Sequence, residues 1–114
     1  MNIKEQILTK YTKTKVIDVF LKDDDIASYI NSGYNFLILK TGDDDKLNLK
    51  KAHFLRELSS IYNCLFVIEK RADIAKLSSA DGILLDELSL SANDISKIID
   101  KNCIIFYRNE IINE

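Results

Sequence analysis

The chain has 114 residues, of which 46% are hydrophobic and 30% charged, and its formal net charge is -2 at pH 7. This length predicts one domain over residues 1–114 and excludes a complete eight-stranded β/α barrel, which normally needs roughly 250 residues. The near-neutral charge argues against nucleic acid as a partner, because nucleic-acid binders usually carry a strong basic excess.

The two cysteines predict neither a metal site nor a disulfide framework. Cys64 and Cys103 each lie inside an apolar run, with no CxxC pair and no histidine cluster nearby. The N-terminus lacks the apolar core of a signal peptide, and no apolar run approaches the roughly 20 residues that span a bilayer. We therefore expect a cytoplasmic protein with reduced thiols and no membrane partner.

Apolar runs alternate with helical patterns along the chain. The segment 3–11 places its apolar residues on one side, which is typical of a short amphipathic helix. Five β-branched and aromatic runs predict strands at residues 16–21, 34–40, 64–68, 82–85 and 103–107. Helices are predicted between them, at residues 26–30, 47–62, 71–78 and 92–100.

The predicted strands are continuous apolar runs, which is typical of strands buried on both faces. This pattern predicts the α/β class, with a parallel sheet of about five strands and crossover helices. An open, doubly wound sheet, as in receiver-like signalling domains, fits the same strand count. It is the weaker alternative, because the predicted fifth strand has no interior lysine.

The region from Leu55 to Arg108 resembles the middle of thiamine phosphate synthases and of the related TenI-like thiazole tautomerases. In that family an apolar strand ends in Ile-Asn-Asp-Arg, then Val-Asp-x-Ala, a short helix and Ala-Asp-Gly-Val-His-Leu-Gly-Gln follow. Here Arg71, Asp73 and Ala75 match the first part, and Ala80-Asp81-Gly82 matches the second at unbroken spacing. The resemblance implies a parallel sheet that corresponds to the first part of a TIM barrel, in a truncated form.

The resemblance also implies where a site would lie and how it has changed. The family's Gln-x-Arg-x-Lys, which holds the pyrimidine and its diphosphate, falls on Ile38, Lys40 and Gly42, so only the charge at Lys40 is kept. A lysine lacks the bidentate fork of arginine. Because the positive charge is kept, we expect Lys40 to bind an anion.

The positions of the family's magnesium ligands carry other residue types. Its Asn-Asp-Arg falls on Glu69, Lys70 and Arg71, so a lysine replaces one metal-binding aspartate. The second such aspartate falls on Ser89, a poor ligand for a hard divalent ion. Glu87 replaces a glutamine of the family motif. We expect no metal site and no catalytic residue, although Mg²⁺ is expected in the family.

Lys40, Lys70, Arg71 and Glu87 are thus predicted to form a vestigial site for a phosphate or another anion. The alternative for Lys70 and Arg71 is that they are solvated charges beside a helix start. The two triple-aspartate runs, at 23–25 and 43–45, are expected to be helix N-terminal acids and not a cation site.

Two functions follow from the resemblance. The first is a thiamine phosphate synthase-like protein with a degenerate active site, a non-catalytic module that binds a phosphorylated small molecule or a protein. The alternative is an enzyme of thiamine biosynthesis that works only with a partner or as an oligomer. Five curved strands leave two edges and an inner face to be covered, which predicts a homo-oligomer or coverage by the chain termini.

Overall fold

The computed structural model describes residues 1–86 and 91–111. In it, five parallel strands form one sheet in the order in which they occur along the chain. The strands are β1 (Thr14–Asp18), β2 (Phe36–Lys40), β3 (Leu65–Glu69), β4 (Gly82–Leu85) and β5 (Ile104–Tyr107). The predicted α/β class and parallel sheet are confirmed.

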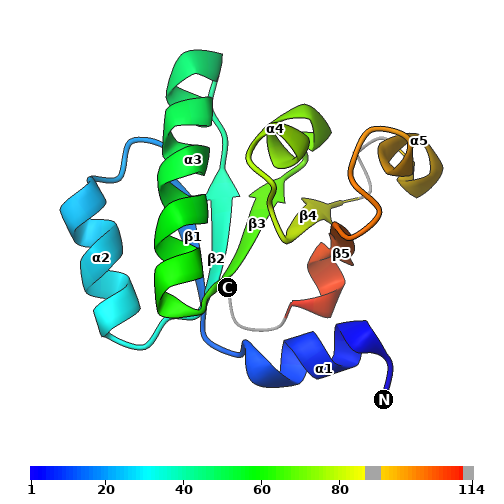
Figure 1. The fold of residues 1–114 in the computed structure, drawn as a ribbon, viewed down its shortest axis with the longest axis horizontal. Coiled ribbons are helices and arrows are strands. Elements are labelled where there is room, and N and C mark those ends of the chain that lie inside the picture. The colour runs from blue at the N-terminus through cyan, green and yellow to red at the C-terminus, as the bar shows by residue number, and fades with distance from the viewer. Residues whose placement is uncertain (87–90, 112–114) are drawn as a thin grey trace.

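Five α-helices and one turn of 3₁₀ helix complete the described elements. They are α1 (Ile3–Lys10), α2 (Asp23–Asn31), α3 (Asp45–Tyr62), α4 (Ala72–Leu77), α5 (Ala92–Ser96) and η1 (Arg108–Glu110). Helices α2 to α5 each connect one strand to the next, so every crossover runs in the same sense around the sheet (Figure 1). A doubly wound sheet would reverse its strand order at one point, and the order β1-β2-β3-β4-β5 excludes that alternative.

The outer face of the sheet is covered by α2, α3, α4 and α5. Their buried residues share one apolar cluster with the strand residues of that face, among them Leu39, Phe66 and Ile83, which are fully buried. We call this set the outer cluster. Helix α3 contributes Ala52 and Leu55, both fully buried, which is the amphipathic pattern that the sequence predicts.

The opposite face of the strands forms a second apolar group, the inner cluster. Its buried members are Phe36, Ile38, Leu65, Val67, Leu84, Phe106 and Ile111. Helix α1 packs against it through Ile7 and Leu8, together with Tyr11, the residue that directly follows the helix. In Figure 1, α1 lies across the end of the sheet opposite to the strand arrowheads. The N-terminal segment therefore covers part of the inner face, in agreement with the expected coverage by a chain terminus.

Local sequence explains where several elements begin and end. The Asp44 carboxylate accepts hydrogen bonds from Lys46 N–H and Leu47 N–H and so caps α3, and Ser91 caps α5 through Asp94 N–H. Helix α2 ends just before Gly33, whose φ of +101° is a backbone conformation that favours glycine. Helix α5 ends at Ser96, before the predicted end at residue 100, and Ile98 is 39% exposed.

The first strand lies earlier than predicted, at Thr14–Asp18 and not at residues 16–21. Val19 is buried in the loop that follows, and Phe20 is 77% exposed. The apolar run therefore extends beyond the strand, and its last residues belong to the connection to α2.

Candidate functional site

Charged side chains gather where the strands end, at the edge of a parallel sheet at which binding sites usually form. We call this edge the rim and define it by five residues: Asp18, Lys40, Glu69, Asp86 and Arg108. The first three end β1, β2 and β3, and the other two directly follow β4 and β5. Asp18 and Lys40 are register partners on neighbouring strands. Residues of opposite sign thus alternate along part of the rim.

Two ion pairs connect the carboxyl ends of different strands. Arg108 donates to a Glu69 carboxylate oxygen at 2.8 Å, across the gap from β5 to β3. The Lys70 ammonium lies 3.0 Å from an Asp86 carboxylate oxygen. Glu69 and Asp86 are the less exposed partners, at 16% and 23% of their side-chain surface. Each half-buried carboxylate therefore has a cation of this chain beside it.

Lys70 adopts a left-handed backbone conformation, with a φ of 64°. This region disfavours residues with a Cβ atom, so the surrounding contacts must hold it. Lys70 N–H donates to the carbonyl of Leu84 at 2.9 Å, which is a link between the end of β3 and β4. The backbone therefore fixes the point from which the Lys70 side chain extends to Asp86.

Arg71 belongs to a different group of charges. Its guanidinium donates to both carboxylate oxygens of Asp73, at 3.0 and 2.9 Å, and to Asp45 at 2.8 Å. These hydrogen bonds lower the pKa of Asp45 and of Asp73 and raise the pKa of Arg71. Arg71 ties the start of α3 to the start of α4, so its charge is already shared by two carboxylates.

Of the four residues predicted to bind an anion, the structure places three. Lys40 is exposed at the end of β2 and has no ion-pair partner within the described ranges. Lys70 and Arg71 are adjacent in sequence but pair with different acids. Glu87 lies outside the described residues, as does Ser89. Lys40 is thus the predicted residue whose charge is most available at the rim.

Sequence reasoning did not select Arg108 or Asp86 as binding residues. Both directly follow a strand, as Lys70 follows β3. The rule that drew attention to Lys70, a charged residue at the carboxyl end of a parallel strand, would have found them as well. Their pairing partners depend on which strands are neighbours, which the sequence pattern does not specify.

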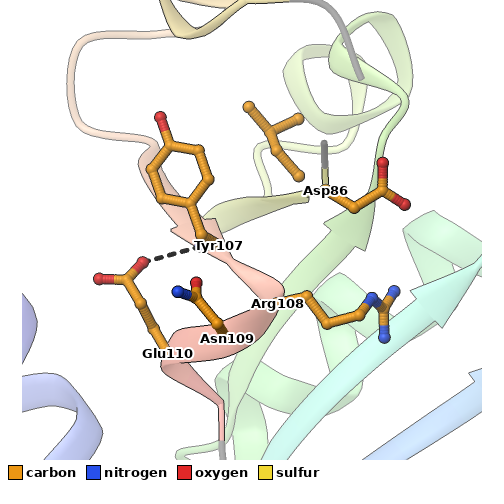
Figure 2. Close-up of a pocket in the computed structure, with 6 residues that line it drawn as sticks. Asp86, Tyr107, Arg108, Asn109 and Glu110 are labelled. Carbon is orange, nitrogen blue, oxygen red and sulfur yellow. Dashed lines mark hydrogen bonds between the residues drawn. The ribbon is translucent and has the colours of Figure 1, made fainter. Parts of the chain in front are cut away.

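An open hollow of about 820 Å³ lies beside the ends of β4 and β5. It is lined by Leu85, Asp86, Tyr107, Arg108, Asn109 and Glu110. Figure 2 shows that Asp86 and Arg108 extend to one side of the hollow, and Tyr107 and Glu110 to the other. The Glu110 carboxylate accepts a hydrogen bond from Tyr107 N–H at 2.8 Å, which orders the turn η1. The hollow therefore has an apolar wall with charged groups at its margins.

The remaining single residues fit the structural interpretations of the sequence. His53 is exposed on α3, and Cys64 is 6% exposed in the outer cluster. Burial raises the pKa of Cys64, and burial, followed by the charges of Asp100 and Asp81, raises the pKa of Cys103 to about 11. Thiols with raised pKa values are poor nucleophiles at neutral pH.

The described residues contain neither a cluster of metal-ligating side chains nor a membrane-spanning helix. Within residues 1–86 and 91–111, no three His, Cys, Asp or Glu side chains gather closely enough to hold a metal ion. In the same ranges, no helix combines the length and the apolar character that crossing a membrane would require.

The class of protein follows from these features: parallel strands in chain order, helices on the outer face and charges at the carboxyl ends describe part of a β/α barrel. The structure superposes on thiamine phosphate pyrophosphorylase from Pyrococcus furiosus with a TM-score of 0.76 and 21% identity. The match covers 88% of this chain and 51% of that one. At this identity the likeness shows the fold.

Sequence comparison identifies the relatives of this chain. No family model matches the chain. Thiamine-phosphate synthase of Prochlorococcus marinus (strain AS9601) is 30% identical in an alignment that covers 84% of this chain and 37% of that protein. The enzyme of Clostridioides difficile (strain 630) is 35% identical over 57 residues, 50% of this chain and 27% of that protein. The chain is therefore a homologue of thiamine-phosphate synthases over a part of their length, and the predicted resemblance is confirmed.

Proposed function

We propose that this protein is a cytoplasmic, non-catalytic relative of thiamine-phosphate synthases that binds a small anionic molecule at the rim. The observation that carries the proposal is the pair of cross-strand ion pairs Glu69–Arg108 and Lys70–Asp86. In them, cations of the protein neutralise two carboxylates beside Lys70, the described residue that stands at a metal-ligand position of the family. A phosphorylated small molecule is the ligand class that the family relationship favours.

The residues at these positions do not fit Mg²⁺. A magnesium ion needs oxygen ligands in near-octahedral geometry, and the ammonium group of Lys70 offers none. Its positive charge, 3.0 Å from the Asp86 carboxylate, also opposes a second cation at that oxygen. No reaction step through a metal is therefore derived for this chain.

Lys40 supports the anion-binding part of the proposal. Its side chain is exposed at the end of β2 and has no carboxylate within ion-pair distance in the part of the chain that the structure describes. A lysine of this kind attracts phosphate as a point charge, without the planar fork of arginine. Such a site is expected to bind with modest affinity and with strong dependence on salt.

Titration calorimetry with inorganic pyrophosphate, at low salt and without divalent ions, tests the binding. We expect Lys40→Met to weaken binding about tenfold, which corresponds to about 1.4 kcal/mol, and Lys76→Met on α4 to leave it unchanged. Equal weakening by both variants would show non-specific attraction, and no binding by the unaltered chain would refute the anion site.

An activity assay tests the non-catalytic part. Purified protein is incubated with the pyrimidine diphosphate and the thiazole phosphate in the presence of Mg²⁺, and thiamine phosphate is measured. We expect no product above a protein-free control. Product that disappears in a Lys40→Met variant would overturn the proposal.

The sheet edges favour a second candidate, an enzyme of thiamine biosynthesis that works only as an oligomer or with a partner. Within the described residues, β1 and β5 each pair with a single strand. Sedimentation of the purified chain, combined with the activity assay, distinguishes the two candidates. A stable homodimer that produces thiamine phosphate supports the second. A monomer that binds pyrophosphate without turnover supports the first.

A further inference from the structure

Helix α1 is the element that covers the inner cluster from the N-terminal side, yet it is weakly embedded. None of its eight residues is buried, and Ile3 at its start is 70% exposed. By contrast, the inner-cluster strand residues Ile38 and Phe106 are fully buried. An isolated helix of this length does not persist in water, so α1 depends on its contacts with the sheet.

Those contacts leave space between α1 and the sheet. A hollow of about 160 Å³, partly open to solvent, is lined by Leu8 of α1, Thr14 of β1, Phe36 of β2 and Glu110 of η1, and by residues that follow α1 or η1: Tyr11, Thr12 and Ile111. Because this hollow is partly open to solvent, the side chains that line it make fewer contacts than they would in a close-packed interior. Helix α1 therefore gains less packing than a helix of the outer face.

One ion pair connects α1 to η1, near the C-terminal end of the described residues. The Lys4 ammonium lies 3.1 Å from both carboxylate oxygens of Glu110 in η1. The same Glu110 carboxylate accepts the hydrogen bond from Tyr107 N–H, and the Lys4 ammonium also lies 5.5 Å from the centre of the Tyr107 ring. Both side chains of the ion pair are about one third exposed, at 29% and 31%. Exposed ion pairs of this kind stabilise little and are screened by salt.

We propose that α1 is a strap that opens while the sheet stays folded. In the closed form, Lys4 holds Glu110 against Tyr107 N–H, so the strap protects both the inner cluster and the last amide of β5. When the strap opens, Ile7, Leu8 and Tyr11 leave the inner cluster, and Glu110 loses the cation that positions it. This local opening has a lower free energy than global unfolding, because it separates few apolar contacts and one exposed ion pair.

Native-state hydrogen exchange of the full chain tests the strap. We expect the amides of α1, and Tyr107 N–H, to exchange at least tenfold faster than those of Leu37 and Val67 in the central strands. Exchange of α1 at the same rate as the central strands would mean that they unfold as one unit, and it would overturn the proposal.

Charge reversal at Lys4 tests the role of the ion pair between Lys4 and Glu110. Lys4→Glu should raise the exchange rates of the α1 amides and of Tyr107 N–H three- to tenfold and leave β2 and β3 unchanged. The double variant Lys4→Glu with Glu110→Lys should return them to within twofold of the original values. Lys97→Glu, which removes another exposed lysine of an ion pair, is the control and should change none of them. Unchanged exchange in Lys4→Glu, or faster exchange of the central strands, would contradict the role of Lys4.

Discussion

Among the described residues, the outer face of the sheet is covered by four helices that each bury apolar residues, whereas the inner face is covered by one helix, α1, with no buried residue. On the outer face, α3 spans 18 residues and places Ala52 and Leu55 in the core with no exposed surface. On the inner face, α1 spans eight residues and contacts the cluster only through half-buried side chains. The helices on the two faces of the sheet therefore differ in how much apolar surface they bury.

The difference shows that burial alone does not measure how firmly a face is covered. Phe36 on the inner face is 1% exposed and Phe66 on the outer face is fully buried, yet only Phe36 borders the hollow beneath α1. Burial records that water is excluded, whereas packing density determines how many contacts hold the covering element. Substitutions at matched positions on the two faces can separate these quantities.

The largest expected effect is the loss of a central phenylalanine. Phe→Ala changes in cores typically cost about 3–5 kcal/mol, and the cost grows with the cavity that remains. We expect Phe66→Ala to lie near the upper end of this range and Phe36→Ala near the lower end, because α1 can settle into the space next to Phe36. Urea unfolding followed by circular dichroism gives both values. A larger loss of unfolding free energy for Phe36→Ala than for Phe66→Ala would contradict the inference that the inner face is less tightly packed.

Gly82 tests whether the inner layer is loose throughout or only beneath α1. A Cβ atom at Gly82 would lie 2.6 Å from the Phe106 ring and 2.7 Å from the carbonyl oxygen of Ile104. We expect Gly82→Ala to cost about 1–3 kcal/mol in the free energy of unfolding, because neither the ring nor the backbone can easily move away. The control is Gly42→Ala, where the nearest atom is a Val19 methyl at 3.3 Å. Similar losses in thermal unfolding for the two variants would mean that the sheet between β4 and β5 is not tightly packed.

Much of the fold could be predicted from the sequence, because strands and helices differ in the period of their apolar residues. The fourth strand was predicted at its observed bounds, 82–85, and the N-terminal segment was predicted as a helix. The first strand was misplaced because Val19, Phe20 and Leu21 are apolar, although Phe20 is exposed in the loop. Hydrophobicity does not distinguish the end of an edge strand from an apolar loop.

The rim was predicted less completely than the fold. Lys70 and Arg71 were selected because they follow a strand, which is a local property. Their partners depend on neighbours in space: Asp86 is beside Lys70 because β3 pairs with β4, and Asp45 is beside Arg71 because α3 begins near α4. A sequence pattern contains the candidates for an ion pair but not the pairing.

The caps of α3 and α1 offer a smaller test of the two layers. Asp44 caps α3, and Asn2 caps α1 by accepting a hydrogen bond from Glu5 N–H at 2.8 Å. Removal of such a cap usually costs about 1 kcal/mol. We expect this loss of global stability for Asp44→Ala, and almost none for Asn2→Ala, because α1 opens before the sheet unfolds. Asp43→Ala, which removes a neighbouring acid that is not the cap, is the control. Equal losses for the two caps in urea unfolding would show that both layers belong to one cooperative unit.

The smallest expected effect concerns Arg71, which joins two helices of the outer layer. Because its hydrogen bonds lower the pKa of Asp45 and Asp73 in the folded protein, these carboxylates stabilise the fold at pH values above their unfolded pKa of about 3.9. This stabilisation is lost as the pH falls from about 4 through the folded pKa values, where both carboxylates become protonated. Arg71→Gln should therefore lower stability at pH 6 slightly and at pH 3 hardly at all, while Lys46→Gln on the same surface should not alter this pH dependence. Carbon-13 NMR titration of the two carboxyl groups provides the direct measurement. If Arg71→Gln leaves both pKa values depressed, the outer helices are not joined electrostatically at this point, and their firmer hold on the sheet must come from apolar packing alone.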